Sequence, residues 1–131
     1  MNPRTPYGNT HLSLVMEYAD GGDLLHKINT HKKNSTYPSE REIWQIFIQI
    51  VRGLKALHDL DILHRDLKCA NIFLFNDGVV KLGDFGFCKS LENANMTKTM
   101  LGSPIYMAPE ILRGEIYSTK ADIWSLGVVL Y

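Results

Sequence analysis

Residues His64 to Asn71 read HRDLKCAN, and the rest of the chain can be interpreted outward from this stretch. The apolar pair at 62–63 precedes it, and the apolar run at 72–75 follows it. Short apolar segments on both sides of a polar run are typical of a loop whose two ends are held in a core. The pattern therefore predicts a loop that holds a carboxylate, a cation and an amide close together.

A second motif follows at a fixed distance. Residues 83–86 read GDFG, and Asp84 lies thirteen residues after Asn71. Between the two motifs an Asp-Gly pair at 77–78 separates two apolar runs, and such a pair is a strong signal for a hairpin because glycine accepts a positive φ. The hairpin expected over 72–82 sets the separation of Asn71 and Asp84 along the chain.

The two motifs resemble the H-R-D-L-x-x-x-N catalytic loop and the D-F-G motif of protein kinases. A chance match to the five fixed positions of the first has a probability on the order of 10⁻⁴ per chain or lower. The likeness continues through A-P-E at 108–110 to residues 117–131, which resemble the central helix of the kinase helical lobe. It implies an α+β kinase fold over 1–131, incomplete, with fifth strand and hinge at 12–22 and a mainly helical lobe at 23–131.

The resemblance gives each polar residue of the two motifs a role. Phosphoryl transfer depends mainly on positioning and charge neutralisation. Asp66 is expected to accept the proton of the attacking hydroxyl, and Lys68 to lie against the γ-phosphate of ATP. Asn71 and Asp84 are expected to bind Mg²⁺, with Asp84 bridging the metal to the phosphates.

The adenine side of the site is expected near the start of the chain. Residues 12–18 read LSLVMEY, which predicts a β-strand, and a Gly-Gly turn follows. On the resemblance Met16 is the gatekeeper, and Glu17 and Ala19 contact adenine through their backbone. Phe73 corresponds to the residue below the adenine ring, although an aromatic residue in a strand is equally expected to be core.

The longest predicted helix spans 37–58, and Ser39 with Glu42 forms a capping-box pattern near its start. One face carries apolar residues at helical spacing, namely Ile43, Ile46, Phe47, Ile50, Leu54 and Leu57. A second apolar set comprises Trp44, Ile48 and Val51. The two sets together predict a helix that is buried on most sides.

Three histidine and aspartate residues also receive a structural interpretation. His58 ends the predicted helix and is interpreted as a helix-terminal residue, not as a ligand. Asp122 lies early in the helix expected at 117–131, where the helix dipole favours an acid. The resemblance implies that Asp122 anchors the backbone of the catalytic loop and that His64 packs against Phe85.

The polar stretch from Phe87 to Leu101 resembles a kinase activation segment. Thr99 occupies the position where such kinases carry an activating phosphate, and Thr97 is the next candidate. Arg65, directly before the catalytic Asp, and Lys89 are expected to bind that phosphate through charge-assisted hydrogen bonds.

Two features resemble the serine/threonine class of kinases: Lys68 two residues after Asp66, and Ser103 in the run before A-P-E. Ser103 is expected to contact Asp66 and Lys68. Residues 72–74 and 82–83 resemble NIMA-related kinases, with autophagy-initiating kinases as near rivals.

The charge composition bears on which classes of binding partner to expect. Lys and Arg together number 14, and Asp and Glu together also number 14, so the net charge is zero. The chain therefore lacks the positive charge that favours binding to nucleic acid or to an acidic membrane. The apolar run at 123–131 is far shorter than the ~20 residues that span a bilayer. Cys69 and Cys88 are expected to be free thiols, which favours a cytoplasmic location and leaves nuclear or cytoskeletal association open.

The chain contains no Gly-rich loop, and no strand Lys or C-helix Glu of the kinase pattern, so it is expected to be a fragment cut at both ends. One hypothesis is a serine/threonine kinase that uses ATP and Mg²⁺ to phosphorylate protein substrates, with this fragment inactive alone. The other is a kinase-derived module that binds or interferes without catalysis. Retention of Asp66, Lys68, Asn71 and Asp84 together favours the enzyme. The sequence gives no indication of substrate or oligomeric state.

Overall fold

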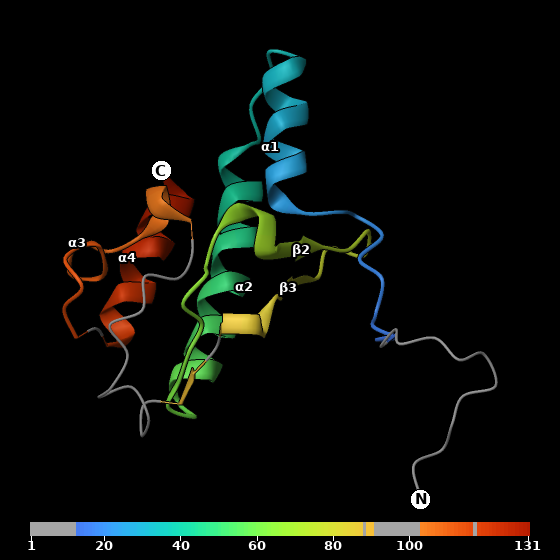
Figure 1. Ribbon diagram of the computed structural model, residues 1–131. Coiled ribbons are helices and arrows are strands. Elements are labelled where there is room, and N and C mark those ends of the chain that lie inside the picture. The colour runs from blue at the N-terminus through green and yellow to red at the C-terminus, as the bar shows by residue number, and fades with distance from the viewer. Residues whose placement is uncertain (1–12, 88, 91–102, 117) are drawn as a thin grey trace, which may run out of the picture.

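Figure 1 shows the computed structural model, which describes residues 13–87, 89–90, 103–116 and 118–131. Its elements in chain order are α1 (Leu24–Lys33), α2 (Glu40–His58), β1 (Ile62–Leu63), β2 (Ile72–Leu74), β3 (Val80–Leu82), β4 (Lys89–Ser90), α3 (Pro109–Leu112) and α4 (Thr119–Leu130), with 3-10 turns at Cys69–Asn71, Phe85–Phe87 and Pro104–Tyr106. Helix α2 runs through the middle, between the hairpin β2–β3 and α4 (Figure 1). The mixed, mainly helical class predicted from the sequence is confirmed.

Helix α2 begins with the predicted cap. The Ser39 hydroxyl accepts a hydrogen bond from the Glu42 backbone N–H at 3.2 Å, and the helix starts at Glu40, three residues later than predicted. The Glu42 carboxylate pairs with Lys27 of α1, and the hydrogen bond from Lys27 lowers the pKa of Glu42. The cap and this ion pair together fix the first turn of α2 against α1.

Only one face of α2 is buried. Ile50 and Leu54 pack with Leu67, Ile72 and Leu126 in the main core cluster, where Ile50 is 1% exposed. The second apolar set is largely exposed and consists of Trp44, Ile48 and Val51. The expectation of burial on most sides is therefore wrong, because these three side chains stay exposed among the described residues.

The hairpin forms as predicted. Strands β2 and β3 pair antiparallel with Ile72 opposite Leu82, and Gly78 turns at a φ of 87°. Gln49 of α2 joins the hairpin edge, because its side-chain oxygen accepts from Val80 N at 3.0 Å and its amide donates to Gly78 O at 3.0 Å. This side chain replaces a neighbouring strand at that edge and ties the hairpin to the helix.

The strand predicted at 12–18 is wrong. Residues 13–18 are exposed and form no regular element, and within the described chain no strand pairs with them. Apolar alternation favours a strand only when a neighbour takes up its backbone hydrogen bonds. The backbone then joins the hairpin at Asp20 and Gly21: the Asp20 carboxylate accepts from Asn76 N at 2.9 Å, and Gly21 N donates to Leu74 O at 3.0 Å.

Helix α4 confirms the helix predicted at the C-terminal end, with Ser118 as N-cap. Its residues Ala121 and Leu126 are buried against the rest of the chain. None of the helices in the described ranges is long and apolar enough to cross a bilayer.

Candidate active site

The Asp66 carboxylate lies at the centre of the site and is almost fully buried, at 4% residue exposure. Its Oδ2 accepts hydrogen bonds from Lys68 Nζ at 2.7 Å and from Asn71 Nδ2 at 3.0 Å. Its Oδ1 has no hydrogen-bond partner among the described residues. One oxygen is therefore held and compensated, while the other, although buried, keeps its capacity to accept a hydrogen bond.

Apolar neighbours fix this loop at both ends, as the sequence predicts. Leu63 and Leu67 are 1% exposed, and Ile72 is fully buried. The turn Cys69–Asn71 then brings Asn71 back toward Asp66, and Asn71 Nδ2 also donates to the Asp66 carbonyl at 2.8 Å. Three polar side chains that lie within six positions of the sequence thus converge on one point.

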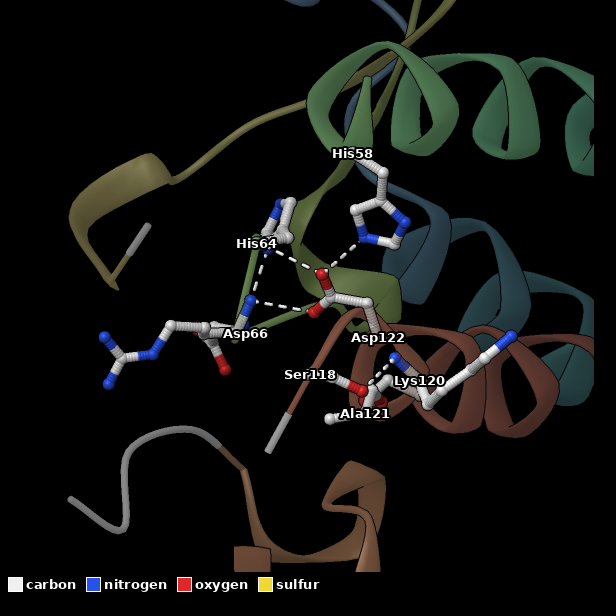
Figure 2. Close-up of polar contacts among 9 residues, drawn as sticks. His58, His64, Asp66, Ser118, Lys120, Ala121 and Asp122 are labelled. Atoms are coloured by element: carbon white, nitrogen blue, oxygen red, sulfur yellow. Dashed lines mark hydrogen bonds and ion pairs between the residues drawn. The ribbon is translucent and has the colours of Figure 1, made fainter. Parts of the chain in front are cut away.

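Asp122 of α4 anchors the backbone of the loop, which confirms its predicted role (Figure 2). His64 N donates to Asp122 Oδ2 and Arg65 N donates to Oδ1, both at 2.9 Å. His58 Nε2 lies 2.8 Å from the same Oδ2, a contact that the sequence interpretation missed. No local sequence signal reveals it, because the two residues are 64 positions apart.

The Asp84 segment is tied directly to the catalytic loop. Gly83 N donates to the Asn71 carbonyl at 3.0 Å, so the two expected metal ligands come from adjoining segments. Asp84 is exposed, with a φ of 58°. Its Oδ1 would lie 3.3 Å from a Cβ placed on Gly86, so the glycine leaves room beside the carboxylate.

These two residues fit a magnesium ion. The Asn71 amide nitrogen is engaged by Asp66, which leaves its oxygen as the atom able to bind a cation. Among the described residues no group of three or more His, Cys, Asp or Glu could hold a metal alone. Mg²⁺ is commonly bound by one or two protein oxygens together with substrate phosphates. Asn71 and Asp84 match that pattern.

His64 packs against Phe85, as predicted, with ring centroids 5.6 Å apart and ring planes inclined by 52°. The imidazole is fully buried. Burial lowers the pKa of His64 below its usual value, although the negative charges of Asp122 and Asp66 oppose the shift. The ring is therefore neutral at neutral pH, and besides packing against Phe85 its Nδ1 accepts a hydrogen bond from Asp66 N at 3.4 Å.

Of the expected adenine residues, Phe73 lies in β2 and Glu17 contacts β3. Phe73 is half-buried, and a Cβ on Gly83 would lie 2.5 Å from its ring. Met16 and Glu17 lie in the exposed segment at 13–18, and the Glu17 carboxylate pairs with Lys81 of β3 at 2.6 Å. The Ala19 carbonyl accepts from Gly22 N. Nucleotide contacts of these residues stay predictions.

The predicted regulatory residues are only partly described. Ser103, Arg65 and Asp66 line one small cavity of about 10 Å³, and Ser103 makes no hydrogen bond with Asp66 in the described structure. Lys89 lies in β4, opposite Leu63. Outside the described residues lie Thr97, Thr99 and Cys88. The phosphate-binding roles stay predictions.

Comparison with known proteins supports the same interpretation. The protein kinase domain family matches residues 4–131. The serine/threonine-protein kinase Nek5 of Homo sapiens is 50% identical over 125 residues, covering 94% of this chain and 17% of that protein. Nek3 of Oryza sativa subsp. japonica is 44% identical over 121 residues, covering 92% and 20%. The kinase atg1 of Dictyostelium discoideum is 42% identical over 125 residues, covering 93% and 18%.

The chain thus spans about a fifth or less of the length of these curated relatives. The matches confirm the likeness that the HRDLKCAN and GDFG motifs predicted.

Proposed function

This chain belongs to the protein kinase family, and from that premise we propose that the protein containing it transfers the γ-phosphate of ATP to Ser and Thr hydroxyls of protein substrates. The observation that carries the proposal is the state of the Asp66 carboxylate. Lys68 and Asn71 hold one oxygen, and the other has no partner in the described chain. A carboxylate held in this way can accept a proton without first breaking a bond.

In the proposed reaction the acceptor hydroxyl donates a hydrogen bond to Asp66 Oδ1. As the hydroxyl oxygen attacks the γ-phosphorus, its proton moves to Asp66 and the bond from the γ-phosphorus to the bridging oxygen breaks, which releases ADP. The Lys68 ammonium lies 2.7 Å from Asp66 and offers positive charge beside the transferred group. Asp122 keeps the backbone of the loop in place throughout.

We propose ATP and Mg²⁺ as the cofactors. The Asn71 side-chain oxygen and the Asp84 carboxylate would hold the metal, which supplies charge neutralisation to the phosphates when bound. Met16, Glu17, Ala19 and Phe73 are proposed to bind the adenine part. Lys68 then serves both the nucleotide and Asp66.

The remaining assignments concern partners and location. Balanced charge supports protein substrates over nucleic acid. The buried thiol of Cys69 is free, which supports a reducing compartment such as the cytoplasm. Residues 1–131 are proposed to form one partial protein kinase domain.

The test uses the complete protein and ATP labelled on the γ-phosphate, with peptides that offer Ser, Thr or Tyr alone. We expect label on Ser and Thr, and we expect Asp66→Asn to lower the turnover by roughly 10²-fold or more through loss of the base. Asp59→Asn is the matched control, because Asp59 is exposed and its carboxylate pairs with Lys55 alone among the described residues. Full turnover in Asp66→Asn, or label on Tyr alone, would refute the proposal.

A further inference from the structure

Gln49 lies on α2 beside the outer edge of β3, and its side-chain carboxamide bonds to the hairpin in both directions. Oε1 accepts from Val80 N at 3.0 Å, and Nε2 donates to Gly78 O at 3.0 Å. Nε2 also donates to the Gln45 carbonyl at 3.1 Å, one turn earlier on the helix. These three bonds use the oxygen and both amide hydrogens. The carboxamide therefore takes the place that a peptide group of a neighbouring strand would take.

A second point of close approach between α2 and β3, which lie beside each other in Figure 1, is one turn beyond Gln49. A Cβ placed on Gly53 would lie 3.3 Å from Cγ and Cδ1 of Leu82. The absence of a side chain at Gly53 thus lets β3 come close to the helix. Gln49 and Gly53 are four positions apart, so they share one face of α2. This face determines both how β3 is held and how near to the helix it lies.

The strand held in this way leads directly into Asp84. Leu82 ends β3, and Gly83 N donates to the Asn71 carbonyl at 3.0 Å. Asp84 has a φ of 58°, a left-handed conformation that residues with a Cβ adopt only when their surroundings hold them there. A shift of β3 away from α2 would therefore move the Asp84 carboxylate relative to Asn71. We propose that Gln49 is a positioning residue for Asp84, because it fixes the edge of β3 on α2.

Amide hydrogen exchange on the complete protein tests this without any activity. Gln49→Met keeps the length of the side chain and removes all three bonds. In this variant the amides of Val80 and Gly83 should exchange about 10-fold faster, the effect of losing about one hydrogen bond. Gly83 is the informative position, because its own hydrogen bond goes to the catalytic loop. The amide of Leu54, in the core of α2, should keep its wild-type rate.

Two further variants separate the hairpin bonds from other effects of the substitution. Gln49→Asn keeps the carboxamide but is one methylene shorter, so it should lose the hairpin bonds and exchange like Gln49→Met. Gln45→Met is the matched control, because Gln45 is exposed and its bond to Gln49 comes from the backbone carbonyl, which the substitution keeps. This control should exchange like wild type at Val80 and Gly83.

A second readout rests on the proposed magnesium site. In the complete protein Gln49→Met should raise the Mg²⁺ concentration needed for half-maximal phosphate transfer about 10-fold, as does the loss of other residues that support metal ligands. Transfer at saturating Mg²⁺ should stay close to that of wild type, because Asp66 keeps its partners. A wild-type protein without phosphotransfer would remove the proposed function, while the exchange result would still decide the role of Gln49.

Three results would overturn the inference. Wild-type exchange at Gly83 in Gln49→Met would mean that Gln49 holds Val80 without affecting the segment beyond it. Equal acceleration at Gly83 and Leu54 would mean that the side chain supports the stability of the whole fold. Lower transfer at every Mg²⁺ concentration, with an unchanged half-maximal concentration, would mean that Asp84 is not the residue affected.

Discussion

Arg65 adopts a left-handed backbone with a φ of 70°, immediately before the carboxylate of Asp66. For a residue with a Cβ this conformation costs about 1–2 kcal/mol, so it persists only where other bonds hold it. The N–H bonds from His64 and Arg65 to Asp122 provide that hold. Local backbone strain is therefore part of the way in which Asp66 is aimed.

A different backbone constraint applies at Gly21, where the chain docks on the hairpin. A Cβ there would lie 2.7 Å from the Leu74 carbonyl oxygen, a backbone atom that cannot move aside within a paired strand. We expect Gly21→Ala to lower the free energy of unfolding by about 1–3 kcal/mol, as overpacking does elsewhere. Urea unfolding of the full chain measures the change.

Gly127→Ala is the control for that substitution. In the part of the chain that the structure describes, a Cβ added at Gly127 would meet nothing within 4 Å beyond its chain neighbours and the backbone of α4, of which Gly127 is an interior residue. Alanine should raise the free energy of unfolding by up to about 1 kcal/mol at such a position. Equal effects of the two substitutions would contradict the close approach at Gly21.

The sequence predicts the polar residues of the site because they are local. Asp66, Lys68 and Asn71 lie within six positions of one another, so their closeness in sequence already indicates that they share a site. The contacts of His58 and Gln49 could not be predicted in this way. Their partners lie 64 and 31 positions away, and these contacts depend on how the helices pack.

At the scale of elements, α2 shows the same difference between local features, which the sequence predicts, and features that depend on packing. Its start could be predicted, because the bond from Glu42 N to the Ser39 hydroxyl is local. The exposure of its second face could not be predicted, because exposure depends on which elements pack against the helix. The segment at 13–18 is a parallel case: its apolar residues fit a strand, but strand formation needs a partner that the described chain does not supply.

Two isoleucines of α2 test this one-faced burial. Ile50 is 1% exposed and Ile48 is 45% exposed, although they are two positions apart. We expect Ile50→Ala to lower the free energy of unfolding by about 2–5 kcal/mol, through lost transfer energy and the cavity left behind. Ile48→Ala should change it far less, since alanine is also the better helix former.

Denaturant unfolding of the two variants and of the wild type gives both values. Comparable losses at the two positions would mean that the exposed face of α2 is covered in the folded protein.

At the scale of the whole molecule, the neutral His64 links stability to pH. Burial lowers the pKa of His64 below 6.5 in the folded state, so the unfolded chain binds more protons as the pH falls through this range. The contribution of His64 is full above about pH 6.5 and is lost as the pH falls toward its folded pKa. We therefore expect the free energy of unfolding to decrease on acidification below that pH.

Unfolding curves of wild type and His64→Gln over the same pH range measure this contribution. The variant cannot titrate at this position, so its stability should depend less steeply on pH. Identical slopes for the two proteins would show that His64 is not buried in its neutral form.

The central claim is that Asp66 acts on the proton of the acceptor while Asp84 acts on the metal. The most direct test measures Mg-ATP affinity and γ-phosphate transfer side by side in the complete protein, for wild type, Asp66→Asn and Asp84→Asn. We expect Asp66→Asn to keep an affinity close to that of wild type while transfer falls roughly 10²-fold or more, and Asp84→Asn to lose magnesium-dependent binding. Unchanged transfer in Asp66→Asn, or a parallel loss of binding and transfer in both variants, would contradict the claim.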